Sequence, residues 1–183
     1  MNKSLLLRSQ MAVLAAFACA FATAASAQTK KPDPAEQAVL LGQFGDWGAY
    51  KATPGGKKVC FALSKPTSAT TDPPGHPRDP SYVFVSTRPA EKVKNEVSVI
   101  VGYKQKAGVD ATASIGSANY VMYTLDEGAW VKNAAEEAQM VNAMRKGEDL
   151  VIKSVSLKDT KTTDTYSLKG LAQALEKVAE ECK

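Results

Sequence analysis

The sequence predicts a mainly β fold, a β-sandwich with one inserted helix and a C-terminal amphipathic helix. About eight short segments rich in β-branched and aromatic residues alternate with turn residues, which is typical of sandwiches. Apolar residues recur with helical spacing in one segment past the middle of the chain and again at its end. The length of 183 residues fits one domain, and the sequence contains no internal repeat.

The first 27 residues have the features of a secretory signal peptide. Lys3 and Arg8 form a basic start, the apolar run M-A-V-L-A-A-F-A-C-A-F-A-T follows at 11–23, and A-S-A precedes the expected cleavage site after Ala27. The apolar run is shorter than the about 20 residues of a transmembrane helix. We therefore expect an exported, soluble protein with no transmembrane segment after cleavage.

Lipid attachment at Cys19 is the alternative interpretation of this region. Phe17 is bulky where a lipid-attachment site requires a small residue, and the A-S-A site lies further along. Signal cleavage is therefore favoured. Residues 28–39, with Pro32 and Pro34, are predicted to form a flexible N-terminal arm, and residues 40–183 the single β-sandwich domain.

The first predicted strands, residues 44–50 and 57–63, form a hairpin around the turn sequence T-P-G-G. The Gly-Lys pair at 56–57 superficially resembles a phosphate-binding loop. That motif requires a glycine where Lys51 stands and a serine or threonine where Lys58 stands. The stretch is therefore predicted to be a core hairpin and not a nucleotide site.

The segment at 65–80, K-P-T-S-A-T-T-D-P-P-G-H-P-R-D-P, holds five of the nine prolines. Proline fixes φ and removes a hydrogen-bond donor, so we expect a long exposed loop, partly polyproline-like. Loops of this length are often functional. His76, Arg78 and Asp79 are the candidate binding residues of this loop.

The remaining elements follow in order along the chain. A helix is expected from the N-cap Asn133, with Glu136 at capping-box spacing, to Gly147. A final amphipathic helix is expected to start at the cap Ser167 and to carry an apolar stripe that ends at Cys182. The other predicted strands are residues 81–87, 96–103, 111–115, 120–125, 129–131, 149–157 and 164–166.

Two cysteines remain after signal cleavage, Cys60 and Cys182. In an oxidising compartment an even pair predicts a disulfide, which would hold the last helix against a core strand. Together with the single histidine, His76, they do not make a zinc site, and no metal or cofactor is expected. Trp47 and Trp130 are predicted to be core anchors.

Charge and motifs exclude several classes of function. Loss of Lys3 and Arg8 with the signal peptide would leave a nearly neutral chain, so nothing predicts binding to nucleic acid. The sequence has no G-x-S-x-G elbow, and the carboxylates of Asp46, Glu96 and Asp126 are scattered along it. The chain is therefore not expected to be an enzyme.

Several separated motifs make the sequence similar to the invasion-associated locus B family of exported Gram-negative bacterial proteins. They are F-G-D-W at 44–47, K-K-V-C-F-A-L at 57–63, R-P-A-E-K-V-K-N-E-V-S-V-I-V-G-Y at 88–103 and Y-S-L-K-G-L-A-Q-A-L-E-K-V-A-E-E-C at 166–182. The resemblance implies an immunoglobulin-like sandwich and a link to host-cell invasion, and it brings no catalytic residues. It also implies a location in the periplasm, with association with the outer membrane or secretion as the alternatives. Many members have a cysteine shortly after the tryptophan. Residues 48–51 lack one, so one disulfide is expected where relatives have two.

The predicted function is that of a binding or interaction protein of the cell envelope. Its partner, an envelope or host-surface protein or a glycan, is not identified by the sequence. One alternative is an envelope hydrolase that uses carboxylates and His76. A second is a structural or stress role in the envelope with no specific ligand.

Overall fold

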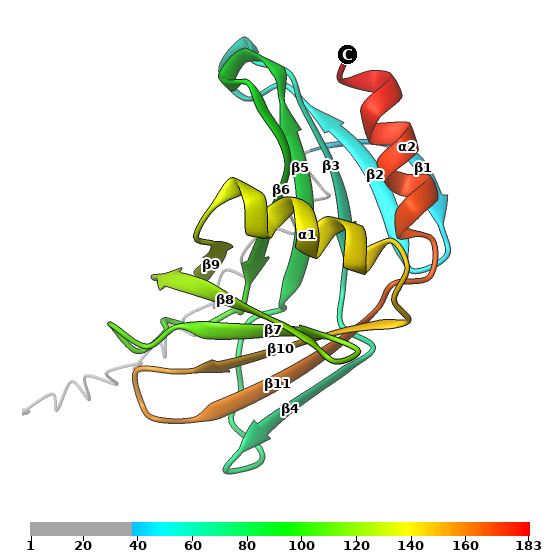
Figure 1. Cartoon of the computed structure of the whole chain (residues 1–183). Coiled ribbons are helices and arrows are strands. Elements are labelled where there is room, and N and C mark those ends of the chain that lie inside the picture. Colours follow the sequence, from blue (N-terminus) through cyan, green and yellow to red (C-terminus); the bar gives the residue numbers. More distant parts are fainter. Residues whose placement is uncertain (1–37) are drawn as a thin grey trace, which may run out of the picture. The chain divides into compact units, whose positions relative to one another are not determined.

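The computed structural model describes residues 38–183, so the predicted signal peptide and most of the predicted arm lie outside the described residues. Figure 1 shows a curved sheet with two helices lying against it. Within these residues the sheet has 11 strands in the order β1-β2-β3-β5-β6-β9-β8-β7-β10-β11-β4, and each strand is antiparallel to its neighbours. The strands are β1 (Val39–Phe44), β2 (Trp47–Ala52), β3 (Val59–Ser64), β4 (Ser68–Asp72), β5 (Tyr82–Arg88), β6 (Val93–Ile100), β7 (Ala111–Ile115), β8 (Ala118–Leu125), β9 (Gly128–Val131), β10 (Asp149–Val155) and β11 (Lys161–Ser167).

The sheet folds over itself into two layers. In Figure 1 the strands β2, β3, β5 and β6 run steeply across the direction of β7, β10, β11 and β4. The inner faces of both halves contribute to one buried cluster, which includes Val85 and Val97 from one half and Ala113 and Ile152 from the other. The prediction of a mainly β, sandwich-like fold with an inserted and a C-terminal helix is confirmed. Hydrogen bonding continues unbroken from one layer to the other.

The inserted helix, α1 (Ala134–Met144), lies over β6, β8 and β9. Its predicted N-cap is confirmed, because the Asn133 side chain accepts a hydrogen bond of 2.9 Å from the Glu136 N–H. Met140, Val141 and Met144 form its buried face.

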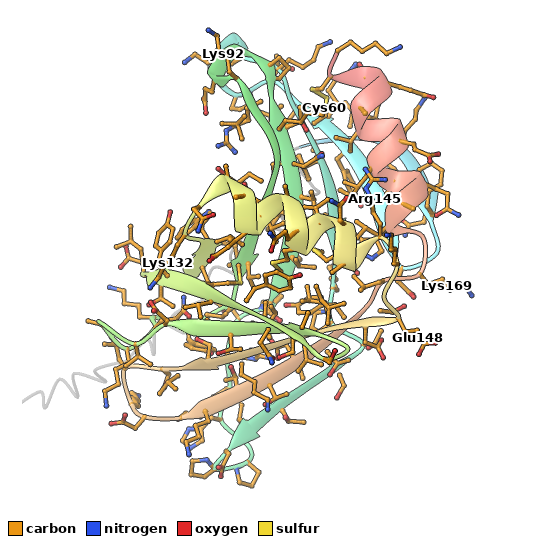
Figure 2. The ribbon with its side chains drawn as sticks, in the orientation of Figure 1. Cys60, Lys92, Lys132, Arg145, Glu148 and Lys169 are labelled. Atoms are coloured by element: carbon orange, nitrogen blue, oxygen red, sulfur yellow. A yellow bond between two sulfur atoms is a disulfide. The ribbon has the colours of Figure 1, made fainter. Side chains whose placement is uncertain are left out.

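The C-terminal helix, α2 (Leu171–Glu181), packs on β1, β2 and β3. The predicted disulfide between Cys60 and Cys182 joins it to β3, and Figure 2 labels Cys60 on that strand. The Lys51 ammonium adds an ion pair of 2.7 Å with Glu181. Neither helix of the described residues is long and apolar enough to cross a bilayer.

The predicted cap of α2 was wrong. Ser167 is the last residue of β11, where it pairs with Asp149, and the helix begins after Gly170. Gly170 has φ +96, and a Cβ there would come within 1.8 Å of the Phe44 carbonyl oxygen. The close approach of two backbones therefore decides where the helix starts.

Two strands were missed or misplaced at the sequence level. Gly45, with φ 55, turns the chain between β1 and β2, whereas the sequence pattern predicted one strand through this residue. The segment at 65–80 was predicted to be a loop throughout, but Ser68–Asp72 forms β4 and pairs with β11. Hydrogen bonds to a distant strand supply order here that local composition does not indicate. The chain also forms two short 3-10 helices, η2 (Pro54–Gly56) and η3 (Pro89–Glu91).

Candidate functional site

The three candidate binding residues lie on the segment between β4 and β5, but they do not share one environment. His76 is exposed. Arg78 is largely buried and points toward β11, where it contacts Asp164. Asp79 is exposed and lines a different recess from the other two.

The side chain of Arg78 anchors this segment to the sheet. Its Nη1 donates to Asp164 Oδ2 at 2.9 Å and to the Val101 carbonyl at 3.3 Å, and its Nη2 donates to Asp164 Oδ1. The two side chains are only 12% and 1% exposed. Burial disfavours the charge of Arg78, but the hydrogen bond and the negative charge of Asp164 outweigh it and raise the pKa of the guanidinium. The bidentate pair therefore holds the segment against the sheet.

A second attachment lies one residue further on. The Asp79 N–H donates to the Gly102 carbonyl at 3.0 Å. Gly102 has φ +76, and a Cβ there would come within 2.1 Å of the Asp79 carbonyl oxygen. Only glycine allows this approach without a shift of the backbone. Arg78 and Gly102 together fix residues 78–79, although the flanking sequence is rich in proline.

A cavity of about 280 Å³ opens beside the fixed segment. It lies between this segment, the chain after β6 and the turn from β10 to β11. Its walls are made by Thr71, His76, Pro77, Arg78, Tyr103, Lys104, Ser156, Leu157, Lys158, Thr160 and Thr162. We call it the cationic cavity, because Lys104 and Lys158 contribute exposed basic groups and none of its described lining residues is acidic.

The turn between β10 and β11 is held by its own hydrogen bonds. The Ser156 hydroxyl accepts from the N–H groups of Lys158 and Thr160, each at 3.2 Å. Asp159, the acidic residue of this turn, pairs with Lys106. Its charge is thereby partly compensated by a lysine that does not line the cavity.

The wall of the cavity also presents apolar and hydroxyl groups. The Tyr103 ring lies about 6.0 Å from the Arg78 guanidinium carbon, and its hydroxyl makes a hydrogen bond of 2.5 Å with Thr162 Oγ1. Pro77 and Leu157 add apolar surface. The arrangement suits a ligand that combines a ring or aliphatic body with an anionic group.

Comparison with known proteins gives one finding. The family model for the invasion-associated locus B (IalB) protein matches residues 49–179. The chain belongs to the IalB family. No curated protein matches the sequence, and no solved structure matches it.

The two tryptophans of this IalB family member occupy different positions. Trp47 is fully buried in the main core, and its Nε1 donates to the Ser167 carbonyl at 2.9 Å. Trp130 lies on the opposite face of the sheet, half-buried, with its ring 5.6 Å from that of Tyr123. The core position expected for Trp130 is therefore not the one it has.

The chemistry available around His76 is limited. None of the described residues that line its cavity is a carboxylate, and the buried carboxylate of Asp164 is engaged by Arg78. In residues 38–183 no group of three or more His, Cys, Asp or Glu side chains is arranged to hold a metal ion.

Sequence reasoning identified the segment but missed most of the cavity. Tyr103, Lys104 and Lys158 come from parts of the chain that lie far from it in sequence. A signal for Asp164 existed, because T-T-D-T-Y places Thr162, Asp164 and Tyr166 on one face of a strand, and all three are buried. A buried aspartate needs a cation, and Arg78 was already a candidate residue.

Proposed function

We propose that this IalB family member is an exported protein of the cell envelope that binds an acidic saccharide in the cationic cavity and does not turn it over. The leader-like first 27 residues and the family support an envelope location. The observation that carries the ligand class is the cavity itself, which combines two lysines with a tyrosine ring and has no acidic described residue in its lining.

The charge of the cavity favours a carboxylate, phosphate or sulfate. Lys104 and Lys158 are exposed and come from different turns, so their ammonium groups can approach one anion from two sides. Arg78 is fully engaged by Asp164 and adds little net charge. The lysines therefore supply most of the attraction, which makes the affinity sensitive to salt.

The shape and polarity of the walls favour a sugar over a simple ion. Tyr103, Pro77 and Leu157 offer apolar surface to the carbon-bound hydrogens of a pyranose ring, and the hydroxyls of Thr71 and Ser156 offer donors and acceptors. A volume near 280 Å³ is at the lower end of the range for small-molecule sites, so one or two sugar rings fill it.

Binding without turnover is favoured over hydrolysis because the catalytic parts are not assembled. Glycoside hydrolysis uses a pair of carboxylic residues across the scissile bond. His76 faces a cavity whose described lining has none. We accordingly expect that neither the unmutated protein nor the His76→Ala variant hydrolyses a bound saccharide.

The test compares one saccharide with and without its charge. The chain from Gln28 onward is titrated calorimetrically with digalacturonate and with its methyl ester, which has the same rings but no carboxylates. We expect binding of the acid only, weakened by salt and lost in the double variant Lys104→Glu/Lys158→Glu. Lys92→Glu, in the turn between β5 and β6 and outside the lining of the cavity, is the matched control for charge reversal.

Equal affinity for the ester, or full binding by the Lys104/Lys158 variant, would contradict the proposed ligand class. Location is tested separately by fractionating cells and sequencing the N-terminus of the mature protein. We expect a protein that begins at Gln28 in the periplasmic fraction. A cytoplasmic protein that begins at Met1 would contradict the proposed location.

A further inference from the structure

The sheet face that points away from α1 and α2 carries a second apolar cluster. Phe61, Leu63 and Tyr82 form its buried part, and Tyr50, Phe84 and Ile100 pack against them. The strand register puts these side chains side by side, since Tyr50 is opposite Phe61, Leu63 opposite Phe84, and Tyr82 opposite Ile100. The ring centroids of Tyr50 and Phe61 are 5.4 Å apart, and those of Phe61 and Phe84 are 5.8 Å apart.

Trp130 and Tyr123 extend this face across β9 and β8. They are opposite each other in the register, and their rings are stacked with centroids 5.6 Å apart and an angle of 26°. A Cβ at Gly128 would come within 2.1 Å of Trp130 Cη2, so the indole lies over the bare backbone of Gly128. Trp130 is only half-buried and also lines a groove, so part of the indole is open to a ligand, and we call it the platform.

A groove of about 570 Å³ runs beside this platform. The described residues that line it are Asp79, Pro80, Tyr82, Ile100, Lys104, Leu125, Asp126, Glu127, Gly128 and Trp130. We call it the aromatic groove. Its floor is apolar, and its rim has the carboxylates of Asp79, Asp126 and Glu127 together with one ammonium, that of Lys104.

The rim is held by backbone hydrogen bonds from a neighbouring segment. The Val101 N–H donates to the Glu127 carbonyl at 2.9 Å, and the Gln105 N–H donates to the Asp126 carbonyl at 2.8 Å. The Gln105 side chain, which is buried, donates to the Gly128 carbonyl at 2.7 Å and accepts from the Ser154 hydroxyl. The acidic turn is therefore positioned before any ligand arrives.

We propose that the aromatic groove is a second binding site that takes the ring of an uncharged saccharide stacked on Trp130. The apolar face of a pyranose packs on an aromatic ring, and its hydroxyls both donate and accept hydrogen bonds. The rim matches this double requirement, since the carboxylates of Asp79 and Asp126 accept and Lys104 donates. This site is distinct from the cationic cavity, although Lys104 lines both.

A lysine-rich peptide is the competing occupant. The carboxylates of the rim would attract it, but Lys104 stands on the same rim and repels it. The mixed rim is the reason to favour the neutral sugar.

The two tryptophans make fluorescence a selective probe. Trp47 is fully buried and Trp130 is half-buried, so acrylamide quenches mainly Trp130. The chain from Gln28 onward is titrated with maltohexaose, cellohexaose and N-acetylchitohexaose, and separately with hexalysine. We expect at least one neutral saccharide to change the emission saturably and to protect Trp130 from acrylamide.

Variants distinguish stacking from loss of fold and from the cationic cavity. Calorimetry is expected to show that Trp130→Ala weakens saccharide binding about tenfold or more, and that Trp130→Phe, which keeps a ring, weakens it less. Lys158→Glu, which changes only the cationic cavity, is expected to leave it unchanged. The proposal is overturned if no neutral saccharide binds the unmutated chain, if hexalysine alone binds, or if Trp130→Ala binds normally.

Discussion

Arg78 and Asp164 are 86 residues apart in the sequence and form a buried bidentate ion pair beneath the segment that joins β4 to β5. The pair fixes one wall of the cationic cavity to β11. It also anchors a segment that is otherwise rich in proline. The stability of this part of the molecule and the shape of the proposed binding site therefore depend on the same contact.

Removing one partner of this pair is expected to lower the stability of the folded protein. Asp164→Asn leaves the Arg78 charge with little compensation, and loss of one member of a buried pair lowers the free energy of unfolding by about 3–5 kcal/mol. Urea unfolding measures the change. The apolar double variant Arg78→Met/Asp164→Leu is the control and should lose less, because it buries no unpaired charge. A larger loss in the double variant would contradict this reasoning.

The Cys60–Cys182 disulfide should contribute strongly to stability. The bond closes a loop of sequence separation 122, and the chain-entropy model gives about 5 kcal/mol for a loop of that size. The variant Cys60→Ala/Cys182→Ala, compared with the oxidised chain by urea unfolding, is expected to show a loss of this order. Equal stability of the two proteins would show that α2 is held by its apolar stripe and the Lys51–Glu181 pair alone.

Gly102 is expected to be intolerant of a side chain. Gly102→Ala combines a positive φ with a clash against the Asp79 carbonyl, so it should lower the free energy of unfolding by about 1–3 kcal/mol and weaken binding in the cationic cavity. Gly108→Ala is the matched control. Gly108 also has a positive φ, +73, but a Cβ there meets nothing within 4 Å. It should cost less and leave binding intact, and equal effects of the two changes would refute a role for the close approach.

The partly buried carboxyl of Glu137 should make the stability of the protein depend on pH. Burial raises the pKa of its carboxyl, although the hydrogen bond of 2.8 Å from the Val97 N–H opposes the change. A raised pKa means that the folded state holds the proton more tightly. The contribution of this carboxyl to the free energy of unfolding is therefore fully present below its ordinary pKa. It is lost as the pH rises through the pKa that the carboxyl has in the folded protein.

Glu137→Gln removes this titration and keeps an acceptor for Val97. Urea unfolding of both proteins at about pH 4 and pH 7 measures the effect, with the ordinary glutamate pKa near 4.3 between them. The free energy of unfolding of the unmutated chain, relative to that of the variant, should be higher at the lower pH. A relative loss at low pH would show that the carboxylate is stabilised in the folded protein.

The fold was largely predictable because its signals are local. Alternating apolar residues from 57 to 63, the N-cap Asn133 and the stripe ending at Cys182 each reflect contacts within one element. The failures involve distant partners. β4 is ordered by β11, and the start of α2 is set by the contact of Gly170 with Phe44.

The candidate site was predictable only in part, for the same reason. The segment with His76 and Arg78 stood out by composition, whereas Lys104 and Lys158 are two ordinary surface lysines until the fold brings them together. Trp130 was assigned to the core because most tryptophans are buried. The G-A-W sequence at 128–130 carried the contrary signal, since a glycine two residues before an aromatic on a strand leaves room for the ring to lie flat.

Chemical shifts of backbone amides provide the most direct test of binding in the cationic cavity. The ¹⁵N-labelled chain from Gln28 onward is titrated with digalacturonate, with its methyl ester as the reference. The expected result is saturable shifts from the acid at residues 76–79, 103–105 and 156–162, and none there from the ester. Shifts confined to another surface, or no shifts at any concentration of the acid, would contradict the proposed function.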